Sequence, residues 1–210
     1  MEYDPSCKDC ERLTSFLTEV KNKNPDYFCK PVPSFGKANS PFLIVGLAPG
    51  MHGANKTGRP FTGDHAGILL YKTLYKFGFS NLEISQSVGD DLILRNCTIT
   101  NAVKCLPPDN KPNNEEIKNC NKFLKSEINT LRQGSILLAL GLIAHNAVMT
   151  ALNLTKKEYK FSHGERHKLP NNLVMYDSYH CSRYNTQTKR LTEKMFHDVF
   201  LSIKNDILFN

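Results

Sequence analysis

The chain has 210 residues, enough for one domain with a sizeable hydrophobic core. Its 27 Lys and Arg against 20 Asp and Glu leave a formal net charge of +7, which suits an anionic partner such as nucleic acid but is also a common solubility device. The sequence lacks an apolar run of about 18 residues and begins with the polar stretch MEYDPSCKDC. We therefore expect neither a membrane span nor a signal peptide, and a cytoplasmic protein.

Apolar spacing predicts alternating helices and strands in the first half of the chain. A helix over residues 7–21 is followed by a Pro- and Gly-rich loop over residues 25–40. The run FLIV at residues 42–45 has the length and β-branching of a strand buried on both faces. After a glycine-rich loop, helical spacing runs from Ala66 to about Phe79, and NCTITNAVK at residues 96–104 predicts a second strand.

The second half continues the same alternation. Asn113 followed by Glu116 resembles a capping box and predicts a helix through Leu131. Strands are predicted at residues 135–140 and 173–177, separated by a helix over residues 141–152, and a polar loop at residues 179–188 precedes a last amphipathic helix. This order predicts a single three-layer α/β domain over residues 1–210, with a central four-stranded, mostly parallel sheet.

The glycine-rich loop after the first strand is the feature around which the chain is organised. Its glycines and prolines prevent a regular element and bring the backbone close to a ligand: they are Gly46, Pro49, Gly50, Gly53, Gly58, Pro60 and Gly63. Open α/β sheets bind ligands at the carboxyl ends of their parallel strands. A nucleotide-phosphate loop is an alternative, although neither G-x-G-x-x-G nor G-x-x-x-x-G-K-[ST] occurs.

Polar side chains stand where the predicted strands and this loop end. Asp64 is the only acid in the loop, Asn101 lies near the end of the second strand, and His180 follows the fourth. Phe61 lies beside Asp64. Each has an ordinary alternative: Asp64 as a helix N-cap, Asn101 as a turn residue, His180 as a solvated side chain and Phe61 as part of the core.

Seven cysteines in a cytoplasmic chain favour metal or redox chemistry over a disulfide framework. Cys7 and Cys10 form C-x-x-C, and Cys105 and Cys120 form a second, looser pair, whereas Cys29, Cys97 and Cys181 stand alone. Four thiolates hold either a zinc ion or an iron–sulfur cluster, and the residue types do not separate the two. An inward-facing Cys120 also fits an ordinary buried cysteine.

Three long motifs resemble the uracil-DNA glycosylase superfamily, most closely its iron–sulfur branch known as family 5. They are GLAPGMHGANKTGRPFTGD, ITNAVKCLPPDNKP and YHCSRYNTQTKRLT. Cys7, Cys10, Cys105 and Cys120 fall where the related enzymes carry their cluster ligands. The resemblance covers nearly the whole chain. It implies a uracil-DNA glycosylase-like fold, a structural [4Fe-4S] cluster and DNA containing uracil or other damaged bases as the partner, and we expect a monomer.

The resemblance also implies roles for the polar residues. Cleaving a base from deoxyribose puts positive charge on the sugar and negative charge on the leaving base. Asp64 would orient or deprotonate the attacking water, His180 would donate to uracil O2, and Asn101 would pair with uracil N3–H and O4, which cytosine reverses. Base contacts are further expected from Gly46, Leu47, Ala48, Asn55 and Phe61.

A base inside a duplex must be flipped out before it is cut. Arg183, Tyr184 and Asn185, at the tip of the last motif, are candidates for the wedge and for DNA contacts. Phosphate contacts are expected from Lys104, Lys111, Lys189 and Arg190. A solvated surface charge is the ordinary alternative for each of these basic residues.

The chain departs from the better-known uracil-specific enzymes in its first motif. Leu47 and Ala48 stand where those enzymes carry an acidic or amide side chain, which leaves the water to Asp64 or to Asn55. The resemblance to family 5 implies activity on bases beyond uracil. No Lys lies in the assigned pocket, so a Schiff base is not expected. A noncatalytic iron–sulfur protein that binds nucleic acid is the alternative function, and a phosphate-loop enzyme is a third.

Overall fold

The computed structural model describes residues 3–209 and contains one mixed sheet of six strands in the order β1-β3-β2-β4-β6-β5. Its four central strands are mutually parallel and are the four that the sequence predicts: β3 (Cys97–Asn101), β2 (Phe42–Gly46), β4 (Ile136–Leu140) and β6 (Val174–Ser178). The predicted three-layer α/β class is therefore confirmed.

The sheet is wider than predicted because an antiparallel strand closes each edge. These strands are β1 (Phe35–Gly36) and β5 (Arg166–Lys168), which pair with β3 and β6. Two or three residues are too few to show the alternation that identifies a strand in a sequence.

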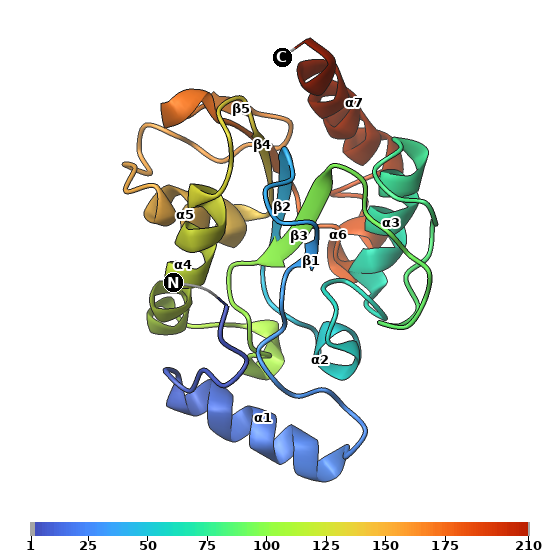
Figure 1. Ribbon diagram of the computed structural model, residues 1–210, viewed down its shortest axis with the longest axis vertical. Coiled ribbons are helices and arrows are strands. Elements are labelled where there is room, and N and C mark those ends of the chain that lie inside the picture. The colour runs from blue at the N-terminus through green and yellow to red at the C-terminus, as the bar shows by residue number, and fades with distance from the viewer. Residues whose placement is uncertain (1–2, 210) are drawn as a thin grey trace.

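Helices cover both faces of the sheet, as Figure 1 shows. On one face lie α3 (His65–Lys76) and α7 (Glu193–Phe209), and on the other α4 (Asn114–Asn129) and α5 (Leu142–Ala151). Side chains of β2 alternate between the two layers. Phe42 and Ile44 belong to the core cluster with α3 and α7, and Leu43 and Val45 to the cluster with α4 and α5. None of the helices within residues 3–209 is both long and apolar enough to cross a bilayer.

Helix α1 (Glu11–Lys23) lies outside these layers, at the bottom of Figure 1. It starts four residues later than predicted (11 minus 7), so Cys7 precedes the helix and Cys10 is its N-cap. Arg12 joins it to α4, with Nε 2.7 Å from Oε1 of Glu116. Glu116 and Asn113 also form the predicted capping box of α4, which confirms that helix start.

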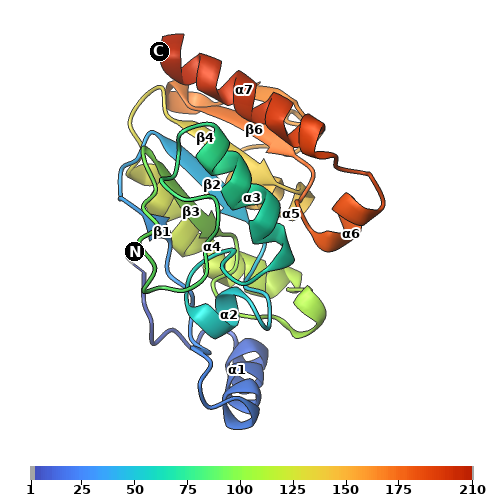
Figure 2. The same cartoon turned by 90° about the vertical axis from the view of Figure 1, so that its right-hand side faces the viewer.

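Two short helices lie in segments that were predicted as loops. They are α2 (Ala54–Thr57), inside the glycine-rich loop, and α6 (Arg183–Gln187), which Figure 2 shows beyond the carboxyl end of β6. Strand β3 ends at Asn101, earlier than predicted. The backbone N–H groups of Ala102 and Val103 still donate to the carbonyls of Gly46 and Leu47, each at 3.0 Å, so the ends of β2 and β3 stay side by side.

Candidate active site

A cavity of about 610 Å³ opens at the carboxyl edge of the parallel strands. It lies between the loop after β2, the end of β3, the start of α3 and the segment that leads from β6 into α6. Open parallel sheets bind ligands at this edge. Eight of the residues expected to contact the base or the DNA line it together: Leu47, Ala48, Phe61, Asp64, Asn101, His180, Arg183 and Tyr184.

Asp64 occupies the N-cap position of α3 by its backbone, but its carboxylate does not cap that helix. Instead, Oδ2 accepts a hydrogen bond from the backbone N–H of Ala54, at 3.1 Å, across the glycine-rich loop. Within residues 3–209 the other oxygen, Oδ1, has no hydrogen-bond partner, so it is free to accept from a bound molecule. Burial raises the pKa of Asp64, and the bond from Ala54 only partly offsets this.

Two glycines leave the space that the Asp64 carboxylate fills. A Cβ on Gly53 would lie 1.9 Å from Oδ1 of Asp64, and a Cβ on Gly50 would lie 2.2 Å from the same atom. Any larger residue at either position would displace the carboxylate. The glycine-rich loop is therefore built around an acidic side chain rather than around a phosphate.

Asn101, at the end of β3, presents an amide to the cavity. Its side chain is 3% exposed, and its Oδ1 is buried without a hydrogen-bond partner in the described part of the chain. A buried carbonyl oxygen left in this state is costly unless a ligand supplies a donor. Gly46 lies beside it, because a Cβ there would come within 2.3 Å of Oδ1 of Asn101 and 2.6 Å of the Phe61 ring.

Phe61 has a left-handed backbone conformation, which contacts of the neighbouring residues stabilise. Its φ of 56° lies in the left-handed region, which is strained for a bulky side chain. The neighbouring carbonyl of Pro60 accepts a bond from the Tyr71 hydroxyl at 2.8 Å, and Arg59 pairs with Asp90 at 2.6 Å. The strain lets the 6% exposed Phe61 ring form a flat wall of the cavity.

His180 faces that ring across the cavity. The two rings are stacked, with centroids 5.9 Å apart and planes inclined by 25°. Burial lowers the pKa of His180 to about 4, so the imidazole is neutral at pH 7 and carries one ring proton to donate. The carbonyl of His180 accepts a bond from Nδ2 of Asn185 at 2.8 Å, which fixes the loop between β6 and α6.

The cavity is also lined by five residues that were not predicted from the sequence: Met51, His52, His65, Asn110 and Ser182. All lie in the three motifs or next to Asp64, so their positions in those motifs were a signal that could have found them. His52 is held by Tyr27, whose hydroxyl lies 2.8 Å from its Nδ1. The Nδ1 of His65 is buried and has no partner among residues 3–209.

The predicted DNA-contacting residues divide into exposed and internal ones. Five are exposed around the cavity or on the segments that lead from it: Lys111, Arg183, Tyr184, Lys189 and Arg190. Asn185 is half-buried and its amide already bonds the His180 carbonyl, so it shapes the loop instead.

Two predictions are wrong. Lys104 is 1% exposed, and its ammonium bonds Thr100 and the Glu127 carboxylate, the latter at 2.7 Å, so it does not reach a phosphate. Asn55 is fully buried and does not line the cavity; its Nδ2 donates to Sγ of Cys29 at 3.4 Å. Sequence position alone could not reveal either burial, because both depend on segments distant in the chain.

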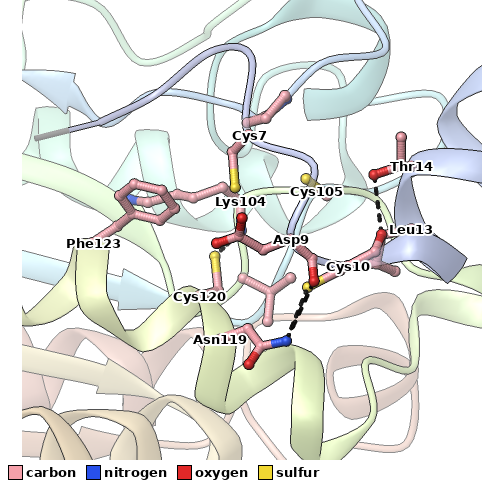
Figure 3. Close-up of a pocket in the computed structure, with 12 residues that line it drawn as sticks. Cys7, Asp9, Cys10, Leu13, Thr14, Lys104, Cys105, Asn119, Cys120 and Phe123 are labelled. Atoms are coloured by element: carbon pink, nitrogen blue, oxygen red, sulfur yellow. Dashed lines mark hydrogen bonds between the residues drawn. The ribbon is translucent and has the colours of Figure 1, made fainter. Parts of the chain in front are cut away.

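The four cysteines predicted as ligands line one small cavity beside α1, which Figure 3 draws. Cys7 and Cys10 come from the segment that leads into α1, Cys105 follows β3, and Cys120 lies in α4. Apolar side chains surround them, and the backbone N–H of Lys104 donates to Sγ of Cys120 at 3.2 Å. Four thiols converging from three segments form a donor set of the kind that holds an iron–sulfur cluster. No three of their sulfur atoms lie within 4.8 Å of one another, which is wider than the ligands of a single zinc ion.

Without a metal, the surroundings of Cys105 and Cys120 favour the protonated thiol over the thiolate. Burial, and then repulsion from the neighbouring thiolates, raises the pKa of Cys105, and burial raises that of Cys120 to about 11 despite the bond from Lys104. Metal coordination deprotonates a thiol outright. Binding of a metal centre here would therefore release the thiol protons.

Comparison with known proteins adds to this geometry. The sequence profile described as "Uracil DNA glycosylase superfamily" matches residues 33–204. Three similar proteins each carry the name type-5 uracil-DNA glycosylase. The protein from Thermus thermophilus is 41% identical over 204 residues, 95% of this chain and 93% of the relative. Those from Pyrobaculum aerophilum and Mycobacterium leprae are 40% and 36% identical, over 92% and 94% of this chain and 86% and 90% of the relatives.

Proposed function

Because this chain belongs to the uracil DNA glycosylase superfamily, we propose that it is a DNA glycosylase that hydrolyses the N-glycosidic bond of uracil. One observation carries the proposal: Asp64, Asn101, His180 and Phe61, from three separate segments, line a single cavity at the carboxyl edge of the sheet. That set supplies an acid, an amide, a neutral imidazole and an aromatic face within one site.

Asn101 recognises the base. Its buried, unpartnered Oδ1 accepts the N3–H of uracil, and its amide nitrogen donates to O4. Cytosine has no hydrogen on N3 and carries an amino group at C4, so both contacts become unfavourable and the site rejects it. Phe61 stacks on the flipped base, and its constrained backbone holds the ring in place before the base arrives.

His180 stabilises the leaving base. Negative charge collects on uracil O2 as the glycosidic bond lengthens, and a hydrogen bond from a positioned donor stabilises it. Since the pKa of His180 is lowered to about 4, the ring acts as a neutral donor at pH 7 and does not transfer its proton. The base then departs as an anion.

Asp64 acts on the other side of the sugar. Its Oδ1 has no hydrogen-bond partner within residues 3–209, so it accepts a hydrogen from the attacking water and aligns it with the anomeric carbon. Its negative charge also stabilises the cationic sugar. Asn55 takes no part, because it is buried away from the cavity.

DNA approaches over the exposed basic residues. Arg183 and Tyr184 lie at the cavity mouth, and the Tyr184 side chain is 69% exposed, as a residue that fills the gap left by a flipped base must be. Lys111, Lys189 and Arg190 are exposed and contact phosphates. These contacts position the duplex without reading its sequence.

Cys7, Cys10, Cys105 and Cys120 hold a [4Fe-4S] cluster with a structural role. When bound, it ties the segment before α1 to β3 and α4, joining Cys10 to Cys105 across 95 positions of sequence (105 minus 10). Zinc is the rival metal, and metal analysis of the purified protein separates the two.

The substrate range extends beyond uracil. Leu47 and Ala48 give the cavity an apolar wall, and its volume of about 610 Å³ has room for purine-sized bases such as hypoxanthine and xanthine. The test incubates the protein with duplex and single-stranded oligonucleotides that carry one uracil, hypoxanthine or xanthine, followed by alkali. Strand breaks at uracil, absent from a matched thymine control, support the proposal. DNA binding without breaks at any of these bases would favour a noncatalytic binding protein.

A further inference from the structure

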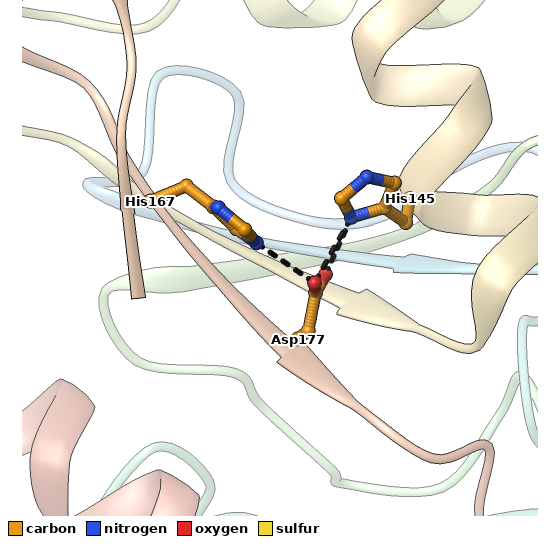
Figure 4. Close-up of side chains that lie close together, drawn as sticks. All are labelled: His145, His167 and Asp177. Atoms are coloured by element: carbon orange, nitrogen blue, oxygen red, sulfur yellow. Dashed lines mark hydrogen bonds and ion pairs between the residues drawn. The ribbon is translucent and has the colours of Figure 1, made fainter. Parts of the chain in front are cut away.

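A second buried cluster of ionisable side chains lies outside the cavity and has no part in the proposed reaction. His145 in α5, His167 in β5 and Asp177 in β6 are 1%, 8% and 0% exposed. Figure 4 shows both imidazoles directed at the Asp177 carboxylate. His145 Nδ1 lies 2.8 Å from Oδ1 and 3.0 Å from Oδ2, and His167 Nε2 lies 2.9 Å from Oδ2.

The hydrogen-bond partners determine the protonation of His145. Its second ring nitrogen, Nε2, lies 2.9 Å from the carbonyl oxygen of Tyr159. The Tyr159 carbonyl can only accept, and so can an ionised Asp177 carboxylate, so opposite these two partners each nitrogen of the ring donates. His145 therefore carries two ring protons and a positive charge, whereas His167 needs a proton only on Nε2.

Asp177 compensates this buried charge. A charge in the interior is costly unless it is paired and its partner's remaining lone pairs are satisfied. The Asp177 carboxylate accepts from both imidazoles and from the backbone N–H of Ser162, at 3.4 Å. These three contacts are all ones that a carboxylate accepts.

A metal ion fits this cluster less well than a proton does. Tetrahedral zinc, with ligand atoms about 2.0–2.2 Å away, would separate those atoms by about 3.3 Å or more. The observed separations between ring nitrogens and carboxylate oxygens are 2.8–3.0 Å, which are hydrogen-bond distances. The three side chains already contact one another where an ion would have to lie.

The cluster is connected to His180 in two ways. Asp177 lies in β6 and precedes His180, on the segment that leaves this strand, by three residues (180 minus 177). From the other side, the N–H of His145 donates to the Gly141 carbonyl at 3.1 Å, and the N–H of Gly141 donates to the Ser178 carbonyl at 2.8 Å. A Cβ on Gly141 would lie 3.4 Å from Cβ of His180, so the start of α5 packs against it.

We propose that His145 is a positively charged positioning residue, which through its ion pair with Asp177 clamps α5 to β6 and holds His180 in the cavity. The role of His180 rests on the proposed function, whereas the charge on His145 does not. Two experiments keep these parts separate.

The first experiment measures the protons on the rings and needs no substrate. Protein labelled with ¹⁵N-histidine is examined by long-range ¹H–¹⁵N correlation at pH 8, and His145→Asn identifies the signals of His145. The expected result is one histidine with both ring nitrogens protonated, missing from His145→Asn. A single proton on the His145 ring overturns the proposal, and so does stoichiometric zinc that His145→Asn removes.

The second experiment is a double-mutant cycle in single-turnover uracil excision. In His145→Asn an amide still reaches Asp177 but has no charge and does not reach Tyr159, so excision should slow by about tenfold or more with DNA affinity unchanged. His167→Gln keeps a neutral donor at the Nε2 position and is the matched control, expected within about twofold of the parent.

The decisive comparison adds His145→Asn to His180→Ala. If His145 acts through His180, the double variant excises no more slowly than His180→Ala. If His145→Asn slows excision by His180→Ala as much as it slows excision by the parent protein, the positioning role is wrong. Asp177→Asn replaces His145→Asn if thermal unfolding shows that the latter is unfolded at the assay temperature. Absence of excision by the parent protein would instead contradict the proposed function and leave the ring protonation as a separate result.

Discussion

The Asp64 carboxylate lies directly against the α-carbon of Gly53, so closely that a Cβ on Gly53 would lie 1.9 Å from Oδ1 and 2.0 Å from Cγ of Asp64. This contact gives a steric reason for a glycine at position 53, where the backbone has φ −104° and ψ −110°. The backbone of the glycine-rich loop thereby sets the position of the acid.

Gly53→Ala should impair excision without removing any functional group. The new methyl group displaces the carboxylate, and we expect uracil excision to fall at least about tenfold while DNA affinity stays within about twofold. Gly89→Ala is the control, since a Cβ there meets nothing within 4 Å. Single-turnover excision and fluorescence anisotropy with a uracil duplex measure the two quantities. Equal rates for the two variants would contradict the packing argument.

The pH dependence of excision should report Asp64 and not His180. Burial raises the pKa of Asp64, so activity falls as acidification protonates the carboxylate. His180, with its pKa lowered to about 4, stays neutral throughout the range above it and adds no step near the usual histidine value. Rate profiles under single-turnover conditions should therefore show an acid limb that His180→Gln retains and Asp64→Asn loses. An acid limb that disappears in His180→Gln would reverse the assignment.

Asp64→Asn should make the protein more stable. An acid whose folded-state pKa is raised contributes most to stability when protonated, and this contribution is lost as the pH rises through that pKa. At neutral pH the buried charge is therefore a cost that the amide removes, and each kcal/mol gained raises the Tm by about 2–4 °C. At neutral pH the Tm of Asp64→Asn should exceed that of the parent, and the difference between the two Tm values should become smaller in acid. A lower Tm at neutral pH would show that the carboxylate is well compensated.

Loss of one cluster cysteine should affect iron content and stability together. As-purified protein should be brown, with about four iron and four sulfide per chain, and Cys105→Ser should lower both contents and the Tm. Cys29→Ser is the control, because Cys29 lies outside that cavity. Iron and sulfide assays with absorption spectra provide the measurement. If the purified protein were colourless, active and loaded with zinc, the prediction of an iron–sulfur cluster would be wrong.

The sequence predicted the parts of the fold that depend on local patterns. Buried runs such as FLIV located the four parallel strands, and Asn113 with Glu116 located the start of α4. The edge strands β1 and β5 were missed because they exist only through pairing with β3 and β6. Helices α2 and α6, of 4 and 5 residues, are likewise too short to show a period.

The site was predictable only as far as residue type and motif position allow. Asp64 has the backbone of a helix N-cap, and only the fold shows that its side chain turns to Ala54 instead. Lys104 resembles a surface lysine, but α4 brings Glu127, 23 residues along, to its ammonium. His145 and Asp177 are 32 residues apart, and nothing in their local sequence indicates that they form an ion pair.

Single-turnover excision by Asp64→Asn tests the central claim most directly. With uracil in duplex DNA and enzyme in excess, we expect the rate constant to fall by about 10²–10⁴-fold relative to the parent, because the water loses its base and the cationic sugar its counter-charge. DNA affinity and the Tm should not fall. Excision at a rate close to that of the parent would contradict the account, since the carboxylate around which the glycine-rich loop is built would then have no part in the reaction.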